Sequence, residues 1–180
     1  MIAIREITNE DVPLLLDYWF TADHHFLTDM GVDVSKLPER APFGKMLESQ
    51  IQAAYPDKKA YALIWLLDGK PVGHSNLNPV VYGDHGWMHL HMWNAENRKK
   101  GMGEQFVRLC LPLYFRNFNL QELYCEPYAL NPAPHKVIER VGFEFEKEYL
   151  TVPGSINFEQ PVKRWTLSRH RFDTLFSQQG

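Results

Sequence analysis

Apolar and polar positions alternate along some stretches of the chain and recur at helical spacing along others. The two periods predict strands and helices respectively. Strands are predicted at 2–7, 61–67, 72–77, 87–93, 120–127, 143–151 and 161–168, and helices at 12–19, at 42–55, from Gly101 onward and at 133–141. The segment 21–41 shows neither period and is predicted to be a loop.

The order of these elements predicts one mixed α/β domain spanning residues 1–180. Asp68-Gly69 between two strands is typical of a hairpin turn. Thr8 to Asp11 resembles a capping box, with aspartate in place of glutamate, ahead of the first helix. Pro112 is expected to kink or shorten the helix after Gly101, because proline lacks the backbone donor. Neither a repeat nor a linker interrupts the pattern.

The composition is that of an ordinary globular protein, with 44% hydrophobic and 23% charged residues. A net charge of −3 gives no reason to expect nucleic acid or a membrane surface as a partner. The two cysteines, Cys110 and Cys125, form neither a disulfide framework nor a zinc pattern. Met1 to Glu10 lacks a signal-peptide core, and no apolar run approaches the ~20 residues of a membrane span, so a cytoplasmic protein is expected.

A basic turn that contains glycine, Arg98-Lys99-Lys100-Gly101-Met102-Gly103, lies between a predicted strand and the helix after it. Glycine lets the backbone approach an anion closely, and the first amides of a helix are free to bind one. The helix dipole and the basic side chains add positive potential, so a pyrophosphate fits this turn. A solvated turn made flexible by glycine is the alternative.

Downstream, Asn131 precedes a predicted helix that ends at Gly142-Phe143. Together with Arg-x-x-Gly-x-Gly after a strand, this pattern resembles the acetyl-CoA-binding signature of the GNAT superfamily of N-acetyltransferases. The order of elements is similar to that fold along nearly the whole chain. The resemblance implies a mixed, mostly antiparallel twisted sheet flanked by helices, with acetyl-CoA as co-substrate.

The resemblance also implies where acetyl-CoA binds. Backbone amides from Lys99 to Glu104 are expected to wrap the pyrophosphate. The preceding strand is expected to splay from its neighbour and to offer its backbone near His91 and Trp93 to the pantetheine arm. Asn131 matches the asparagine that contacts the cofactor in this family, and His135 is expected near it.

Two branches of the superfamily compete for the acceptor. His89-Leu90 before the glycine turn and Glu126-Pro127 before Asn131 resemble the branch that acetylates small amines, among them siderophore lysines and aminoglycosides. The branch that acetylates ribosomal-protein N-termini often carries serine where this chain has Pro134. The resemblance therefore implies a primary amine of a small molecule or side chain as acceptor, with a protein N-terminus as the alternative. The protein itself is expected to be a monomer or a homodimer.

An amine that attacks a thioester must lose a proton, and the oxyanion that forms must be held. His89 is the expected base, because imidazole titrates near neutrality and this histidine matches that of the siderophore branch. His91 shares its strand face and is the second choice, while Glu126 is expected to orient the amine or His89. Two hydrogen-bonded core histidines are the alternative. A His-x-His metal site is not expected, since no third ligand has suitable spacing.

The resemblance is incomplete at the general acid. Many superfamily members protonate the departing thiolate with a tyrosine on the last helix, where this chain has Ile138; Tyr128 is an alternative donor. This gap leaves a non-catalytic acyl-CoA-binding module as a second hypothesis. The segment from Thr21 to Lys36 carries three carboxylates, which are expected either to attract a cationic amine or to belong to a solvated loop: Asp23, Asp29 and Asp33.

Overall fold

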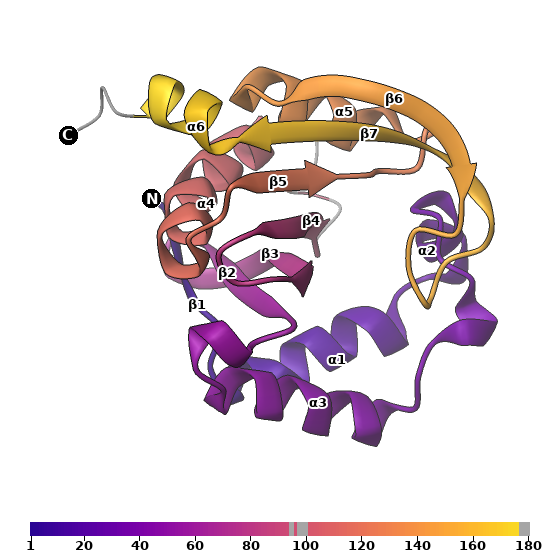
Figure 1. Cartoon of the computed structure of the whole chain (residues 1–180). Coiled ribbons are helices and arrows are strands. Elements are labelled where there is room, and N and C mark those ends of the chain that lie inside the picture. Colours follow the sequence, from indigo (N-terminus) through magenta and orange to yellow (C-terminus); the bar gives the residue numbers. More distant parts are fainter. Residues whose placement is uncertain (94–95, 97–100, 177–180) are drawn as a thin grey trace.

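The computed structural model describes residues 1–93, 96 and 101–176 (Figure 1). Its helices are α1 (Val12–Thr21), α2 (His24–Asp29), α3 (Arg40–Gln52), α4 (Met102–Phe118), α5 (Pro132–Val141) and α6 (Arg169–Phe176). Its strands are β1 (Ile2–Glu6), β2 (Tyr61–Leu67), β3 (Lys70–Val80), β4 (His85–Met92), β5 (Glu122–Cys125), β6 (Glu144–Thr151) and β7 (Gln160–Ser168). None of the helices described is both long and apolar enough to pass through a membrane.

The seven strands form one sheet in the order β1-β2-β3-β4-β5-β7-β6. Every neighbouring pair is antiparallel except β4 and β5, which run parallel. Strands β2, β3 and β4 are a meander whose first turn is the predicted Asp68-Gly69 hairpin. The prediction of a mixed, mostly antiparallel sheet flanked by helices is confirmed.

Helices cover both faces of this sheet (Figure 1). On one face, α4 and α5 enclose the main core, in which Phe106 and Phe115 of α4 pack with strand residues such as Leu63. On the other face, α1 and α3 lie together, and a second apolar cluster gathers around Trp19 and Leu27. One face of β3 and β4 therefore packs against the main core, and the opposite face is available for a site.

The seam between β4 and β5 is short. His85–Trp87 of β4 lie opposite Glu122–Tyr124 of β5. The pairing with β5 ends at Trp87, whereas β4 continues to Met92. The two strands therefore separate where the family resemblance implied a splay.

The connection between β6 and β7 is fastened to the segment that follows α2. The N–H of Asp33 donates to the carbonyl of Ile156 at 2.8 Å, and Val32 forms an isolated β-bridge with Asn157. Residues 153–157, called the strap below, thus cross from the far end of the β6–β7 hairpin to the α2 region (Figure 1). Sequence separations this large leave no periodic signal, so the strap was not predicted.

The segment 21–41 was expected to be a loop, and this expectation is wrong. Residues 24–29 form α2 because the carboxylate of Asp23 accepts hydrogen bonds from the N–H groups of His25 and Phe26, at 2.8 and 3.2 Å, and thereby caps the helix. Leu27 anchors the helix with 1% of its surface exposed. The helix has six residues, too few to repeat an apolar period.

Three further details concern capping, proline and the C-terminal helix. The capping box at Thr8 is confirmed, since its N–H donates to the carboxylate of Asp11 at 2.8 Å. Helix α4 passes through Pro112 and runs to Phe118, so the expected shortening is wrong. No pattern predicted α6, which packs Phe172 on Phe115 of α4 with ring centroids 4.2 Å apart.

Candidate functional site

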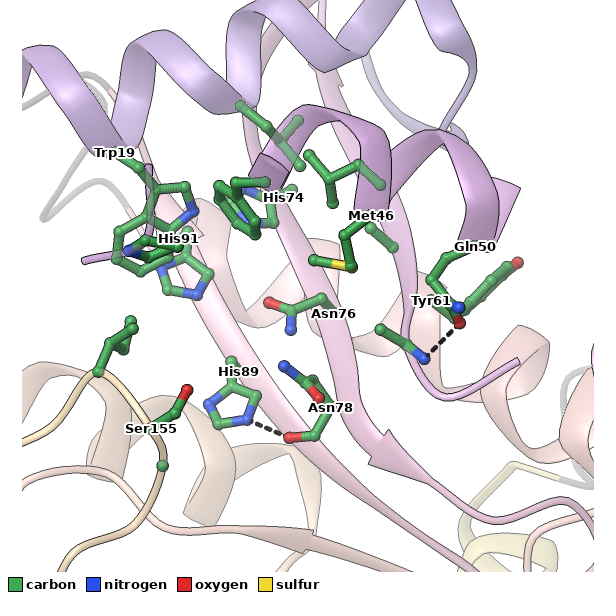
Figure 2. A pocket seen from close by; sticks show the side chains of 18 of the residues that line it. Trp19, Met46, Gln50, Tyr61, His74, Asn76, Asn78, His89, His91 and Ser155 are labelled. Atoms are coloured by element: carbon green, nitrogen blue, oxygen red, sulfur yellow. Dashed lines mark hydrogen bonds between the residues drawn. The ribbon is translucent and has the colours of Figure 1, made fainter. Parts of the chain in front are cut away.

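A cavity of about 750 Å³ lies between β3 and β4 on one side and α1, α3 and the strap on the other (Figure 2). Its floor consists of side chains that β3 and β4 direct to the same face, where Asn76 lies opposite His89 and His74 lies opposite His91. The walls are completed by residues from the covering elements, among them Trp19, Met46 and Ser155. The structure thus brings both predicted histidines into one enclosed space.

His89 is held by the backbone of the neighbouring strand. Its Nε2 lies 2.8 Å from the carbonyl oxygen of Asn78 (Figure 2). The pairing of β3 with β4 shifts register between Leu77 and Val80, which takes Asn78 out of the regular ladder. A carbonyl only accepts, so Nε2 carries the proton and Nδ1 has the lone pair. Nδ1 has no hydrogen-bond partner among the described residues and is available as a base.

The surroundings keep this imidazole neutral. Desolvation lowers the pKa of His89 below its ordinary value of 6.5, although the hydrogen bond to Asn78 and the charge of Glu126 oppose the shift. The ring is exposed to the cavity while protein surrounds it on the other sides. A neutral imidazole with a free Nδ1 lone pair is the form that can accept a proton at physiological pH.

His91 belongs to a packed aromatic group. Its ring stacks on His74 with centroids 4.5 Å apart, and its Nδ1 lies 3.1 Å from the hydroxyl of Tyr18. The indole N–H of Trp93 donates to Nδ1 of His74 at 2.8 Å. Burial lowers the pKa of His91 well below the ordinary value and that of His74 to about 3. Nδ1 of the second-choice base is therefore already engaged by Tyr18, whereas Nδ1 of His89 has no hydrogen-bond partner among the described residues.

This group predicts a loss of stability in acid. The folded-state pKa of His74 lies below 6.5, its ordinary value, so the unfolded chain binds more protons at pH values between the two. The contribution of His74 to the free energy of unfolding is therefore fully present above pH 6.5 and is lost as the pH falls toward 3. Between pH 7 and 5 we expect His74 to account for a loss of about 2 kcal/mol in the free energy of unfolding. Urea unfolding at each pH measures it.

His74→Gln is the control, because glutamine does not titrate and can still accept from Trp93. The difference in stability between pH 7 and 5 should be smaller in the variant than in the wild type by about 2 kcal/mol. Identical pH profiles for the two proteins would show that His74 does not titrate in this way.

The carboxylate of Glu126 is hydrogen-bonded by side chains of β6 and β7. Its side chain is 9% exposed and accepts a hydrogen bond from Nε of Arg164 at 2.6 Å and another from the hydroxyl of Tyr149. Arg164 in turn lies over the ring of Trp87, 5.0 Å from its centroid. Glu126 does not line the cavity, so the expectation that it orients the amine directly is not supported. Its charge acts on His89 from a distance.

The turn expected to bind pyrophosphate is described from Gly101 onward. Gly101 is the N-cap of α4 with φ +72°, a conformation that favours glycine, and no side chain caps this helix end. A Cβ at Gly101 would meet no described atom within 4 Å, its chain neighbours aside. This geometry fits a phosphate.

The other residues predicted to bind the pyrophosphate lie in different surroundings. Glu104 pairs with Arg108 at 3.2 Å, and the nearest atom to a Cβ at Gly103 would be Val137 of α5 at 3.5 Å, so both lie at the junction of the two helices. Met102 is 9% exposed and belongs to the core. Three predicted cofactor-binding residues lie outside the described part of the chain: Arg98, Lys99 and Lys100.

The free edge of β4 requires a correction. The N–H of Trp93 donates to the carbonyl of Val72 in β3 at 3.0 Å. Backbone groups alternate in direction along a strand, so His91 and Trp93 both direct theirs to β3. Leu90 directs its backbone groups away from β3, into the splay. The expected backbone contacts of His91 and Trp93 with the pantetheine arm therefore pass, as a proposal, to Leu90.

Asn131 and His135 differ in how much of their side chains is already in use. Asn131 is the N-cap residue of α5, and its side chain makes no capping bond. His135 is 9% exposed; its Nδ1 accepts from the indole N–H of Trp165 at 3.1 Å and its Nε2 lies 3.0 Å from the carbonyl of Tyr128. Both ring nitrogens of His135 therefore serve the fold, whereas Asn131 is available to a ligand.

The acidic segment does not contribute negative charge to the cavity. Asp23 caps α2, and Asp33 accepts from the N–H of Ser35 at 3.1 Å. None of the three predicted carboxylates lines the cavity, although the same segment supplies Met30 and Val32 to its wall.

Burial raises the pKa of Cys125 to about 12, so its thiol stays protonated. No cluster of three or more metal-ligating side chains occurs among the described residues.

Comparison with known proteins gives matches along most of the chain. The model of the acetyltransferase (GNAT) domain matches residues 2–144. The aminoglycoside N(6')-acetyltransferase type 1 of Klebsiella pneumoniae is 20% identical over 164 residues, 85% of this chain and 79% of the relative.

Solved structures resemble the whole fold. An aminoglycoside acetyltransferase in complex with coenzyme A and kanamycin has a TM-score of 0.73 at 17% identity, covering 97% of this chain and 98% of the other. The spermidine N-acetyltransferase of Vibrio cholerae, bound to CoA and spermine, has a TM-score of 0.76 at 15% identity, covering 95% and 97%. A ribosomal L7/L12 alpha-N-protein acetyltransferase has a TM-score of 0.75 at 13% identity, covering 94% and 95%.

Proposed function

The chain belongs to the GNAT acetyltransferase family and is an acetyl-CoA-dependent N-acetyltransferase, and from this premise we propose that its acceptor is the primary amine of a small molecule. The observation that carries the proposal is the cavity in which His89 presents an Nδ1 with no hydrogen-bond partner among the described residues. Both the relative from Klebsiella pneumoniae and the spermidine N-acetyltransferase of Vibrio cholerae are named for small amines, which supports the same choice.

The residues present fit acetyl-CoA. The N-terminus of α4 at Gly101, which no side chain caps, would hold the pyrophosphate, and the backbone of Leu90, directed away from β3, would pair with the pantetheine arm. The side chain of Asn131 is free to contact the same ligand. When bound, acetyl-CoA supplies an acetyl group activated as a thioester. The groups that fit the cofactor thus extend from β4 past the start of α4 to α5.

His89 performs the proton transfer in this proposal. A primary amine arrives mostly as its ammonium form, with a pKa of about 10. Nδ1 of His89 accepts the proton as the amine becomes a nucleophile, and the Asn78 carbonyl stabilises the imidazolium that results through the Nε2–H bond. His89 therefore needs no carboxylate partner to be oriented. This use of the site argues against a non-catalytic acyl-CoA-binding module.

The strap supports a small acceptor. Its backbone bonds to residues 32–33 close one side of the cavity, where a polypeptide would need an open groove. Pro153 and Ser155 of the strap both line the cavity, so the strap is part of the acceptor wall. The ribosomal-protein alternative has no comparable support in the described residues.

The proposal predicts the outcome of a competition between acceptors. Purified protein with acetyl-CoA should release CoA with small primary amines at a kcat/KM at least about tenfold above that for peptide N-termini, a difference of about 1.4 kcal/mol in transition-state binding. Mass spectrometry of the products identifies the acetylated nitrogen. Efficient labelling of peptide N-termini with no labelling of small amines would refute the proposal.

A further inference from the structure

The charged residues of the cavity wall indicate which small amine it accepts. Resting on the proposed function, we infer that the acceptor carries one positive charge, its reacting amine, on an apolar body. Glu6 is the single carboxylate among the described lining residues, beside the cations Lys36 and Lys58. Residues 94–95, 97–100 and 177–180, which the structure does not describe, contain no aspartate or glutamate.

Glu6 lies far from His89, and one of its two carboxylate oxygens, Oε1, is already hydrogen-bonded. Its carboxylate accepts hydrogen bonds from the hydroxyl of Tyr55 at 2.5 Å and from the amide of Asn117 at 3.3 Å. Strand register runs from Glu6 through β2 and β3 to Leu90. This places Glu6 three strand spacings, roughly 14 Å, from the strand that carries His89. The second ammonium group of a six-carbon diamine that reacts at His89 would not reach Glu6 across this distance.

The two lysines add positive charge to the wall. Lys58 is 6% exposed and donates to the carbonyls of Gln50 and Ile51 at the end of α3. Lys36 donates to the carbonyl of Asn157 at 2.8 Å. Lys36 is also paired with the carboxylate of Asp33 at 3.6 Å, so Lys58 is the lysine whose charge opposes an additional ammonium group. An amine with several charges, such as kanamycin or spermine, would have to lose water from charges that this wall does not neutralise.

Polar uncharged side chains and apolar side chains occupy different parts of the cavity. Asn76, Asn78 and Ser155 lie around His89, whereas Met46 of α3 lies toward the opposite wall (Figure 2). The helices that cover the cavity supply mainly apolar side chains, such as those of Leu15, Phe43 and Leu47. One end therefore suits an amine and its hydrogen bonds, and the remainder suits a hydrocarbon or aromatic body.

A pair of amines that differ by one charge tests the inference. n-Hexylamine and 1,6-diaminohexane have the same chain length, and the second ends in a further ammonium group. We expect kcat/KM for n-hexylamine to exceed that for the diamine by about tenfold or more, and spermine and kanamycin to be poorer still. Equal or better use of the diamine, spermine or kanamycin would overturn the inference and leave the proposed function standing. Failure of every amine, with acetyl-CoA still bound in calorimetry, would refute the proposed function itself.

A variant provides the matched control. Met46 lines the cavity and is 37% exposed, so a polar side chain can be tolerated there. Met46→Glu should raise the preference for diamine over monoamine by about tenfold relative to Met46→Gln, which has the same shape and no charge. Equal preferences in the two variants would show that charge in this wall does not select the acceptor.

Discussion

Replacing His89 by alanine should lower turnover about 10²- to 10⁴-fold, the usual contribution of a positioned general base. The ring is exposed to the cavity and its described hydrogen bond goes to a backbone carbonyl, so the variant should fold. Affinity for acetyl-CoA should change little, because the N-terminus of α4 is unchanged. Steady-state kinetics and calorimetry measure the two quantities separately.

The pH dependence of the rate is a second test of His89 as the general base. Desolvation lowers the pKa of His89, so the rate should be lost on the acidic side at a pH below 6.5, and not at the ordinary histidine value expected from the sequence. The acid limb should disappear in His89→Gln, which keeps most of the volume. His85→Ala is the control, since His85 lies on the same strand but pairs with Asp84 at 3.0 Å. If His89→Gln turns over like the wild type with its acid limb intact, His89 is structural.

Gly101→Val should weaken the binding of acetyl-CoA by about 100-fold or more, because its side chain would lie at the uncapped N-terminus of α4 and disturb the first amides. Part of any effect will be conformational, since φ is +72° at this position. Such a backbone costs a residue with a side chain about 1–2 kcal/mol. Calorimetric titration of the folded variant measures the affinity.

Gly69→Val is the control that separates backbone strain from the loss of the binding site. Gly69 has φ +77°, and a Cβ there would likewise meet no atom within 4 Å, but this glycine lies in the β2–β3 hairpin. The two variants should lose similar stability in thermal unfolding, while only Gly101→Val should lose acetyl-CoA affinity. Unchanged affinity in Gly101→Val would remove this turn from the binding site.

Several features of the site could be predicted because they depend on short-range patterns. The two-residue period of β4 placed His89 and His91 on one face, and the position of Gly101 between a strand and a helix gave the start of α4. The direction of backbone groups was predicted wrongly at Trp93, because it depends on which neighbouring strand takes each group. That choice is made by the register of β3, which no local pattern contains.

Other features depend on contacts between distant segments. The bond from His89 to Asn78 requires the register shift in β3, and the stacking of His91 on His74 requires the pairing of two strands. Helix α2, which Asp23 caps, has only six residues, too few for an apolar period to reveal a helix there. The strap joins segments more than a hundred residues apart, so neither half indicates the other.

The way the strap is fastened bears on how acceptor choice can change during evolution. The link between Asp33 and Ile156 uses backbone atoms alone, and the bridge between Val32 and Asn157 is of the same kind. The Asn157 side chain adds a bond to the carbonyl of Gly31 at 2.8 Å, whereas the side chain of Ser155 takes no part in these links. Ser155, which faces the cavity beside His89, can vary while the catalytic strand and the core beneath it stay unchanged. Descendants of this chain could acquire new acceptors by substitutions in the strap, at little cost in stability.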